Sequence, residues 1–327
     1  MTKPNITLQE VELPEFGKCA EMPDIPPSVF EAILNKTFKM NKIIIAILFI
    51  IIGSCKMKNK SDEIKQKIIG EWFYADENEY DLSQSSEHGY TFFPNNSVDY
   101  KCGHYKSIQS KIDNDNISQY IGSLTKYEIV GDTLKIFSLD DSKWNRRKIV
   151  RISNDTLAFQ GERVNGDENV DCCLEKYVKH SQKLDTTFQF DRISLVSSGC
   201  YGSCPIFKVN LYSNGNFEFY GHQYTVNRGY FASKIAIEKY NEYANNFRKV
   251  NLSALKENYE ADHTDDEAVR VYFWKNNKMI KKIQDYGRVS PSAFICAYTQ
   301  LRNLYQQIEL IKMDEKIGKQ IFNDDFR

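Results

Sequence analysis

The sequence predicts a mainly β part followed by an α+β part. We expect an antiparallel barrel or strongly curved sheet over about residues 66–180, and an antiparallel sheet with packed helices over residues 186–311. Three observations lead to this prediction. The chain has 327 residues, which is long enough for two domains. The first range repeats strand–turn–strand patterns with few helix signals, and the second mixes strand patterns with apolar residues at helical spacing.

The composition excludes several classes of protein. Apolar residues make up 41% of the chain, which is enough for folded cores and excludes a mostly disordered protein. The 43 basic side chains nearly balance the 44 acidic ones, whereas a nucleic-acid-binding protein usually carries a basic surplus. No apolar run approaches the roughly 20 residues of a membrane-spanning helix. We therefore expect neither a nucleic-acid partner nor a transmembrane segment.

Residues 40–55 have the pattern of an export signal. Met40-Asn41-Lys42 gives a short basic start, ten apolar residues follow at 43–52, and the segment ends in Gly53-Ser54-Cys55. This apolar run suits a signal-peptide core and is too short to cross a bilayer. The I-G-S-C ending resembles the lipobox of bacterial lipoproteins. The resemblance implies a signal peptide at residues 40–54 and a Cys55 thiol that carries diacylglycerol, with a further acyl chain such as palmitate on the new amino terminus. The alternative is a core segment that ends in Cys.

The segments around this signal follow from it. Residues 1–39 precede the signal, so either translation starts at Met40 or the chain carries an amino-terminal extension without an apolar face of its own. Residues 55–65 are expected to be a polar tether. The residue after Cys55 is not Asp, which retains lipoproteins at the inner membrane of some Gram-negative bacteria. We therefore expect a lipid-anchored envelope protein at the outer rather than the inner membrane. The sequence does not indicate which leaflet carries it.

Two hairpins set the strand register of the first part. They turn at Gly131-Asp132 and Asn154-Asp155, which are two-residue turns of a type that accepts positive φ. A further pair of strands flanks Pro94-Asn95-Asn96. Counting back from the two turns pairs four sets of apolar residues: Ile129 with Leu134, Tyr127 with Ile136, Ile152 with Leu157, and Val150 with Phe159. Because these pairs share one face, turn and pattern agree on the register.

The first part opens with Gly70-Glu71-Trp72. Together with the run of hairpins, this opening resembles the G-x-W start of the lipocalin-like domains of bacterial envelope proteins, in which the Trp closes the barrel floor. The resemblance implies a barrel that holds a small apolar ligand; the alternative is a small barrel filled by its own side chains. The candidate inward-facing, ligand-lining residues are Trp72, Phe92, Tyr127, Ile136 and Phe159.

The second part alternates strands and helices. We expect a strand at 190–196, a hairpin with a three-residue loop around Asn214-Gly215-Asn216, and a helix at 235–249. A second hairpin at 269–283 turns at Asn276-Asn277, and a last helix starts at Ser290-Pro291 as cap and first-turn proline. The side chains expected in the core are Phe207, Val209, Leu211, Phe217, Phe219, Ala236, Tyr240, Tyr243, Phe247, Val269, Val271, Phe273, Ile280, Phe294, Ala297, Leu301, Leu304 and Ile308. Residues 312–327 are expected to be a polar tail.

A C-x-G-x-C-P motif lies between two of these strands, at Cys200-Tyr201-Gly202-Ser203-Cys204-Pro205. Together with its context, it resembles the marker of a family of uncharacterised domains in bacterial lipoproteins. That resemblance implies a fold and no reaction. We expect a structural disulfide between Cys200 and Cys204, because an exported chain meets an oxidising compartment and Gly202 lets the short loop turn back. A redox or metal site is the alternative, although a redox pair usually has two intervening residues.

Other chemistry-bearing residues give weaker signals. Cys102 could pair with Cys172 or Cys173 in an exported chain, and the partner of Cys296 is open; their spacings match no standard zinc pattern. The acidic cluster 262–267 could supply a general acid and base or calcium ligands, or be a solvated loop. We predict no catalytic residue, metal or cofactor from these patterns.

Three function classes remain. The favoured one is a non-enzymatic envelope lipoprotein that binds a small apolar ligand or another envelope protein. The second is an envelope enzyme, hydrolytic or thiol-based, that uses residues 262–267 or the Cys200/Cys204 region. The third is a structural or stress-related spacer. A pocket with convergent polar groups beside Asp265 or Cys204 would favour the enzyme. A dry barrel cavity would favour small-ligand binding, and a solid barrel with an exposed apolar patch would favour a protein partner.

Overall fold

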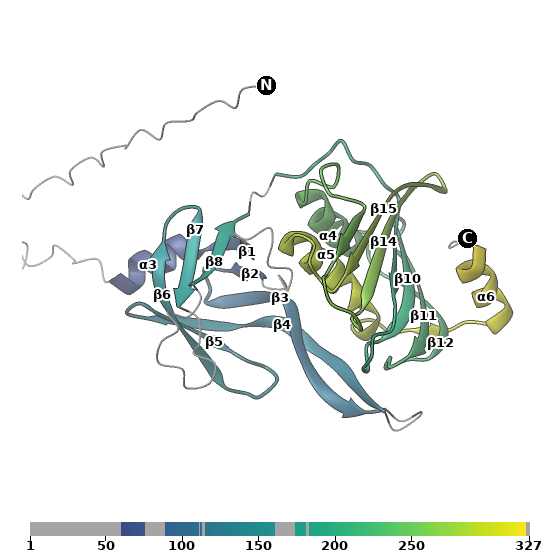
Figure 1. The fold of residues 1–327 in the computed structure, drawn as a ribbon, viewed down its shortest axis with the longest axis horizontal. Coiled ribbons are helices and arrows are strands. Elements are labelled where there is room, and N and C mark those ends of the chain that lie inside the picture. Colours follow the sequence, from purple (N-terminus) through teal and green to yellow (C-terminus); the bar gives the residue numbers. More distant parts are fainter. Residues whose placement is uncertain are drawn as a thin grey trace, which may run out of the picture. The chain divides into compact units, whose positions relative to one another are not determined.

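The computed structural model of the chain describes residues 60–75, 89–110, 112, 115–160, 174–180 and 183–324. Residues 58–327 form one compact unit. It contains a closed antiparallel barrel of eight strands and a second sheet of eight strands with helices (Figure 1). This confirms the predicted combination of a mainly β part and an α+β part. The predicted signal 40–54, the lipidation site Cys55 and the segment 1–39 lie outside the described residues.

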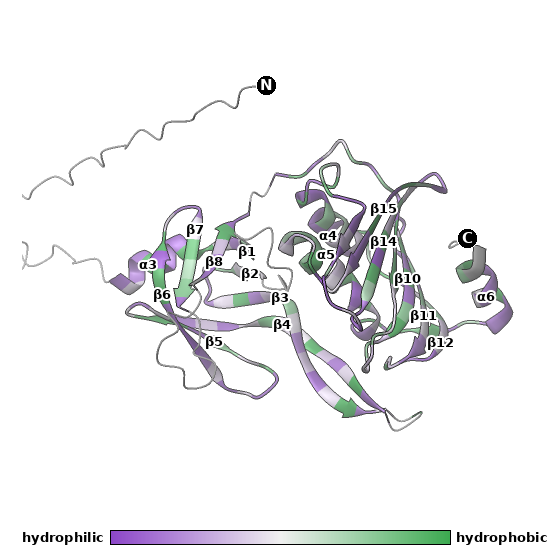
Figure 2. Ribbon diagram, viewed as in Figure 1, coloured by the Kyte–Doolittle hydropathy of each residue, from purple (hydrophilic) through white to green (hydrophobic). Residues whose placement is uncertain are grey.

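The barrel is an antiparallel meander closed by pairing of its first and last strands. Its strands are β1 (Gly70–Tyr74), β2 (Gly89–Phe92), β3 (Ser97–Gln109), β4 (Asn116–Val130), β5 (Thr133–Phe137), β6 (Trp144–Ile152), β7 (Thr156–Gln160) and β8 (Leu174–Lys179). Polar and apolar residues alternate along β3 and β4 (Figure 2). Because side chains of a strand point alternately to its two faces, this alternation fills the interior with apolar groups.

The first predicted hairpin has the expected register. Ile129 lies opposite Leu134 and Tyr127 opposite Ile136 on β4 and β5. Glu128 and Lys135 face each other on the outer surface, with 3.8 Å between Oε2 and Nζ. The turn type and the apolar pattern therefore set this register together, because a slip by one residue would bury the charged pair.

The second hairpin corrects one predicted pair. Ile152 lies opposite Leu157 as expected, but Phe159 faces Ile149 rather than Val150. The register shifts between Ile149 and Arg151, so β6 contains a bulge at Val150. A bulge inserts one unpaired residue and moves the following side chains to the other face. As a result Ile149 is buried, whereas 46% of Val150 is exposed.

A helix, α3 (Lys60–Ile68), packs against the barrel and corrects the predicted tether. Its apolar residues Ile64 and Ile68 are buried in the same core as Trp72. The Trp72 indole Nε1 donates a hydrogen bond to the carbonyl oxygen of Ile68 at 2.6 Å, so the ring is buried with its one polar group satisfied. Within residues 55–65, the portion from Lys60 onward is therefore helical rather than tether, because the i, i+4 pair Ile64 and Ile68 gives it an apolar face.

The second sheet has the strand order β13-β15-β14-β9-β10-β11-β12-β16. Its strands are β9 (Arg192–Ser197), β10 (Ile206–Tyr212), β11 (Asn216–Gln223), β12 (Gly229–Lys234), β13 (Asn258–Glu260), β14 (Ala268–Lys275), β15 (Lys278–Tyr286) and β16 (Ile311–Lys312). All neighbours are antiparallel except β13 and β15, which are parallel. The helices are α4 (Ile237–Lys249), α5 (Ser292–Arg302), the 3₁₀ turn η1 (Leu304–Gln306) and α6 (Glu315–Asp324). None of the helices in the described residues is long and apolar enough to cross a membrane.

The core of the second part lies between one face of this sheet and helices α4 and α5. The three-residue loop after β10 is confirmed, since Leu211 lies opposite Phe217 and Val209 opposite Phe219. A list of the fully buried aromatic rings on this face comprises Phe207, Phe217, Phe219, Phe273 and, from the helices, Phe247, Phe294 and Tyr298. At roughly 1.5–3 kcal/mol for each buried side chain, these rings supply much of the driving force for folding.

Three predicted details of this part are wrong. Ile280 is 41% exposed, because a register shift after Phe273 leaves Ile283 as the buried residue of β15. Ala236 is the exposed residue before α4, which starts at Ile237. Ser290 does not cap α5, because its hydroxyl donates to the buried carboxylate of Asp285 at 2.5 Å and the helix starts two residues later.

Residues 312–327 do not form only a polar tail. Helix α6 packs on the sheet face opposite α4 and α5, where Phe322 is buried and its ring lies 6.0 Å from those of Tyr220 and Tyr230. Gly318 allows this close packing, since a Cβ at that position would lie 2.2 Å from the Tyr230 ring. Apart from Ile317, its exposed residues in the described part are polar, which is why composition alone predicts a tail.

Candidate functional site

The loop between β9 and β10 carries the predicted disulfide. Cys200 and Cys204 are bonded, with their Cα atoms 5.6 Å apart, which confirms the predicted staple. The backbone N–H of Tyr201 donates to the carbonyl oxygen of Asp265 at 3.0 Å. The disulfide loop is therefore joined to the loop that precedes β14, and the two form one edge of the candidate site.

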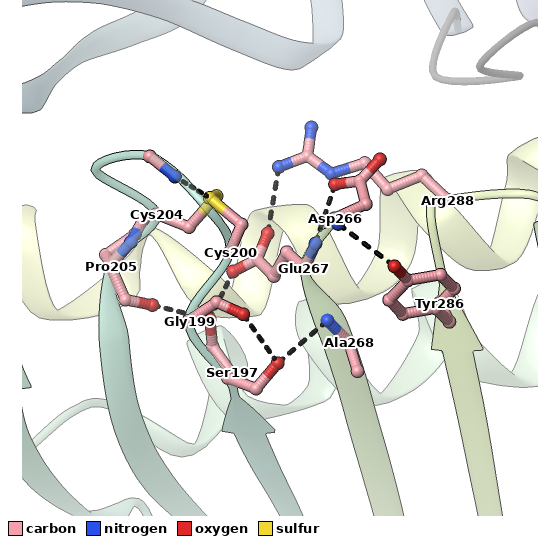
Figure 3. The surroundings of a disulfide bond; sticks show 12 residues. Ser197, Gly199, Cys200, Cys204, Pro205, Asp266, Glu267, Ala268, Tyr286 and Arg288 are labelled. Carbon is pink, nitrogen blue, oxygen red and sulfur yellow. Dashed lines mark hydrogen bonds and ion pairs between the residues drawn. A yellow bond between two sulfur atoms is a disulfide. The ribbon is translucent and has the colours of Figure 1, made fainter. Parts of the chain in front are cut away.

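Glu267 lies directly beside this loop, at the end of the acidic segment 262–267. Only 1% of its surface is exposed. Its carboxylate accepts hydrogen bonds from Ser197 of β9 and Arg302 of α5, and from Arg288 after β15 at 3.2 Å. Figure 3 shows Glu267 between Ser197, the disulfide and Arg288. Four separate segments of the second part therefore meet at one buried carboxylate.

The charges around Glu267 keep it ionised. Burial alone would raise the pKa of this carboxyl, but the positive charges of Arg302 and Arg288 and the hydrogen bonds from Arg302 and Ser197 outweigh burial and hold the pKa below its usual value. A carboxylate that is buried, paired twice and hydrogen-bonded is a poor proton acceptor. Glu267 therefore orients the two arginines rather than acting as a general base.

A pocket of about 450 Å³ opens in front of these arginines. One wall comes from β3 and β4 of the barrel, and the other from the disulfide loop, α5 and η1. Among the described residues that line it, the only charged side chains are Arg288 and Arg302. The remaining lining residues are Tyr100, Cys102, Gly103, Tyr105, Ser118, Ser203, Cys204, Pro205, Phe207, Thr299, Asn303, Tyr305 and Gln306. The pocket thus offers two guanidinium groups among aromatic rings and neutral hydrogen-bonding groups.

Two hydrogen bonds hold the walls of the pocket together. Asn303 Nδ2 donates to the Tyr105 hydroxyl at 2.6 Å, and the backbone N–H of Tyr120 donates to Gln306 Oε1 at 2.9 Å. Burial raises the pKa of Tyr105 to about 12, although Arg302 and Asn303 act in the opposite direction. The Tyr105 hydroxyl therefore stays protonated at neutral pH and can donate a hydrogen bond into the pocket.

The other members of the acidic segment do not converge on the pocket. His263 Nε2 lies 3.2 Å from Asp266 Oδ2, and His263 and Asp262 are both exposed. The carboxylates of Asp266 and Asp262 accept hydrogen bonds from the protonated ring and add negative charge, which raises the pKa of His263, with burial acting against them. Within the described parts of the chain, no group of three or more His, Cys, Asp or Glu side chains is placed to hold a metal ion. The segment thus combines one buried structural carboxylate with an exposed loop.

The five candidate ligand-lining residues of the barrel lie together in its interior. Four of them are fully buried in one cluster, and Ile136 packs against that cluster. Their rings contact each other and their neighbours: the centroids of Phe92 and Tyr127 are 5.1 Å apart, and those of Phe159 and Tyr177 are 5.4 Å apart. Such edge-to-face contacts are typical of a close-packed core. The packing favours a barrel filled by its own side chains, which was the alternative at the sequence level.

The structure places Cys102 beside Cys296, not in a bond with another residue. Their Sγ atoms are 3.7 Å apart and both side chains are buried thiols. Cys102 carries a free thiol, and its predicted partners Cys172 and Cys173 lie outside the described residues. Sequence spacing could not find this contact, because the two residues are 194 positions apart and lie on a strand and a helix that no local pattern connects.

Sequence reasoning also missed the arginines of the pocket. Arg302 and Glu267 are 35 positions apart and Arg288 follows a strand, so no motif links the three. One signal was present: Arg302 directly follows Leu301 at the end of a helix whose apolar face is buried. A charged residue next to such a face must find a partner, since an unpaired buried charge is strongly unfavourable.

Comparison with known proteins matches most of this second part to a domain family without an assigned function. Residues 191–308 match the family model "Domain of unknown function (DUF6438)". The matched range includes the disulfide, Glu267, Arg288 and Arg302, and covers about a third of the chain. This is consistent with the expectation of an uncharacterised domain in this part. A comparison with curated proteins finds no match to the chain.

Proposed function

We propose that this protein is a lipid-anchored lipoprotein of the bacterial cell envelope and that it acts as a non-enzymatic binding module. Its binding site is the pocket between the barrel and the disulfide loop, and its ligand is a small anion that carries carboxylate or phosphate groups. The observation that carries the proposal is the charge of the pocket, whose wall contains two arginines and no acidic side chain among its described residues.

The arginines suit an anionic ligand because both line the pocket, while the carboxylates near them, Glu267 and Asp266, do not line it. Arg302 is buried and paired with Glu267, whereas Arg288 keeps 28% of its side chain exposed. A guanidinium group presents several N–H donors in one plane, so it can bind a carboxylate or phosphate while one edge stays paired with Glu267. Arg288 is therefore the main ligand-binding residue, and Arg302 contributes mainly its charge.

Neutral groups complete the recognition of such a ligand. The Tyr105 hydroxyl, with its pKa of about 12, and the Thr299 hydroxyl can bind its polar atoms. The rings of Phe207 and Tyr305 give apolar surface for a carbon skeleton. Small-molecule sites combine apolar surface with a few placed polar groups, and this pocket contains both kinds of lining. The barrel, whose G-x-W start and hairpins resemble lipocalin-like domains, then serves as a scaffold for one wall of this pocket.

Two features favour binding over the enzyme alternative. Cys200 and Cys204 are joined in a disulfide, so neither offers a thiolate. Glu267 is enclosed by its partners and is held ionised, so it is unsuited to take up a proton during a reaction. The acidic segment and the disulfide loop, which were the candidate catalytic regions, thus both serve to shape the pocket.

The export part of the proposal rests on the sequence. The basic start, the ten apolar residues at 43–52 and the I-G-S-C ending at Cys55 agree with one another. The disulfide Cys200–Cys204 supports export independently, since stable disulfides belong to oxidising compartments. Outer-membrane retention remains the preferred location, because Lys56 follows the lipidated Cys.

Calorimetric titration of the full-length protein at low salt, with inorganic phosphate and with citrate, tests the binding site. We expect saturable binding of at least one of these anions, and binding at least about tenfold weaker in the variant Arg288→Gln, because one charge-assisted hydrogen bond is lost. Arg270→Gln is the matched control, since Arg270 is a half-buried arginine of β14 that does not line the pocket. Absence of binding of both anions, or equal affinity in both variants, would refute the proposal.

A further inference from the structure

Two buried cysteines lie side by side where the barrel contacts the second part. Cys102 lies on β3 and Cys296 on α5, with 3.7 Å between their Sγ atoms. Exposed fractions are 6% for Cys102 and 2% for Cys296. Both thiols pack in a small cluster with Phe73 of β1. The two thiols therefore lie side by side in the buried contact between α5 and the barrel.

A bulge in β3 directs Cys102 toward the helix. The register between β3 and β4 shifts between Asp99 and His104, and Gly103 has a φ of +78°. This backbone conformation suits glycine, and bulges change the direction in which neighbouring side chains point. Cys102, Gly103 and His104 are consequently all buried, although simple alternation would expose one of them. The local backbone is thus shaped to bring the Cys102 sulfur to α5.

We infer that Cys102 and Cys296 form a second disulfide, which links the barrel covalently to α5 when the protein meets a disulfide oxidant. A sulfur–sulfur bond is about 2.05 Å long, so the two sulfurs must approach by roughly 1.7 Å. Rotation about the side-chain bonds or a small shift of α5 along β3 provides this. The proposal depends on neither the pocket's ligand nor the lipid anchor, because it concerns only the reaction of two neighbouring thiols.

The pocket gives an oxidant access to one of these thiols, because Cys102 lines it. The Cys102 thiolate attacks one sulfur of a small disulfide such as glutathione disulfide, and the first glutathione thiolate leaves. The Cys296 thiolate then attacks the Cys102 sulfur of the mixed disulfide and releases the second glutathione. Two protein thiols thereby lose two protons and two electrons, and one glutathione disulfide is reduced to two thiols.

The bond would fix the width of the pocket. Gly103 and Tyr105, which follow Cys102 on β3, belong to one wall, and Thr299 and Arg302, which follow Cys296 on α5, belong to the other. A covalent link next to both walls prevents them from moving apart. The oxidised protein should therefore have a pre-formed pocket, whereas the reduced protein can widen it.

Peptide mapping of the full-length protein tests the inference. The protein is extracted from membranes, incubated with glutathione disulfide or with dithiothreitol, denatured, alkylated and digested with trypsin without reduction. We expect the peptides 102–106 and 289–302 to be joined after oxidation and separately alkylated after reduction. The peptide 193–208, which contains both cysteines of the staple, is the internal control for an intact disulfide.

Single variants confirm the assignment of the bond. Cys102→Ser and Cys296→Ser should each lose the joined peptide and leave the remaining thiol open to alkylation. Oxidation should raise the melting temperature of the wild-type protein by more than that of either variant, because the variants keep only the Cys200–Cys204 disulfide. Alkylation of both thiols after oxidation, a stable glutathione adduct on Cys102, or a bond from Cys102 to Cys172 or Cys173 would overturn the inference. The wild-type map decides the question even where a variant fails to fold.

Discussion

Glu71 of the barrel and Lys249 at the end of α4 form an ion pair with 3.0 Å between Oε2 and Nζ. Glu71 is 3% exposed, and its other oxygen lies 3.3 Å from the Nζ of Lys101 on β3. Glu71 directly precedes Trp72 in β1. Because neighbouring side chains of a strand point to opposite faces, Trp72 points into the barrel core and Glu71 points outward to α4. One carboxylate thereby connects two strands of the barrel with a helix of the second part.

This pair predicts a large effect of a single substitution. Glu71→Gln should lower the free energy of unfolding by about 3 kcal/mol, because two partly buried lysines lose their shared counter-charge. Urea unfolding measures it. The matched control is Glu63→Gln, which removes an exposed pair with Lys67 and should cost less than about 0.5 kcal/mol. Equal costs for the two variants would contradict the role assigned to Glu71.

Glu267 should make stability depend on acid pH. Its pKa in the folded protein lies below the ordinary value of 4.5, so its contribution is fully present above about pH 4.5 and is lost as the pH falls through the lowered pKa. Glu267→Gln should therefore be less stable at pH 7 by about 3 kcal/mol and should lose less stability than the wild type on acidification. Urea midpoints between pH 7 and pH 3 measure both effects, with the exposed Glu128→Gln as control. Parallel pH profiles for Glu267→Gln and the wild type would count against the buried ion pair.

The bulge in β6 predicts that alanine substitution destabilises the protein much more at Ile149 than at the neighbouring Val150. Ile149→Ala should cost about 3 kcal/mol, because it leaves a cavity against Phe159. Val150→Ala should cost about 0.5 kcal/mol or less, because nearly half of that side chain is exposed. Chemical denaturation of both variants compares them directly. If Val150→Ala destabilised the protein more than Ile149→Ala, Val150 rather than Ile149 would have to face Phe159.

The disulfide of the β9–β10 loop should stabilise the fold without taking part in chemistry. Closing a loop of about five residues is worth about 2 kcal/mol on the chain-entropy estimate, so the double variant Cys200→Ser/Cys204→Ser should lose about that amount. A melting curve with and without dithiothreitol provides the check: the reductant should lower the melting temperature of the wild type by more than that of the double variant, which keeps only Cys102 and Cys296 as a reducible pair among the described cysteines. A double variant that melts like the oxidised wild type would show that the disulfide is not a structural staple.

The proposed anchor predicts the outcome of one substitution in the leader. Cys55→Ala should abolish lipidation and signal processing, because no other residue at that position can form the thioether. Mass spectrometry of membrane fractions, with globomycin as a reference for blocked processing, detects the change. Cys19→Ala should be lipidated like the wild type, since Cys19 precedes the signal. A Cys55→Ala protein that is still processed and lipidated would exclude the lipobox.

Local patterns predicted those parts of the fold in which a turn and an apolar pattern act together. The pairing of Ile129 with Leu134 follows from a two-residue turn, and that of Leu211 with Phe217 from a three-residue loop. Bulges escaped prediction, because Ile149 and Val150 are both apolar and either could face inward. The same holds for Ile280, whose place in the core is taken by Ile283. An extra residue in a strand changes no composition and so gives no signal in the sequence.

The site was less predictable than the fold for a different reason. The disulfide could be predicted, because Cys200 and Cys204 are close in sequence and the intervening glycine allows the turn. The charge cluster required contacts between segments that only the folded sheet brings together, as with Glu267 and Arg302. An acidic run such as 262–267 is usually solvated, and nothing in the run itself distinguishes its last residue. Long-range pairing of this kind is set by tertiary structure rather than by local sequence.

The position of α3 sets how far the protein can stand from a bilayer. The helix starts at Lys60, and Ile64 and Ile68 fix it in the barrel core. With the proposed lipid on Cys55, five residue steps separate the anchor from the helix, and a fully extended chain spans at most about 3.5 Å per step, or roughly 18 Å. The barrel would then be a neighbour of the lipid headgroups rather than a domain on a long stalk.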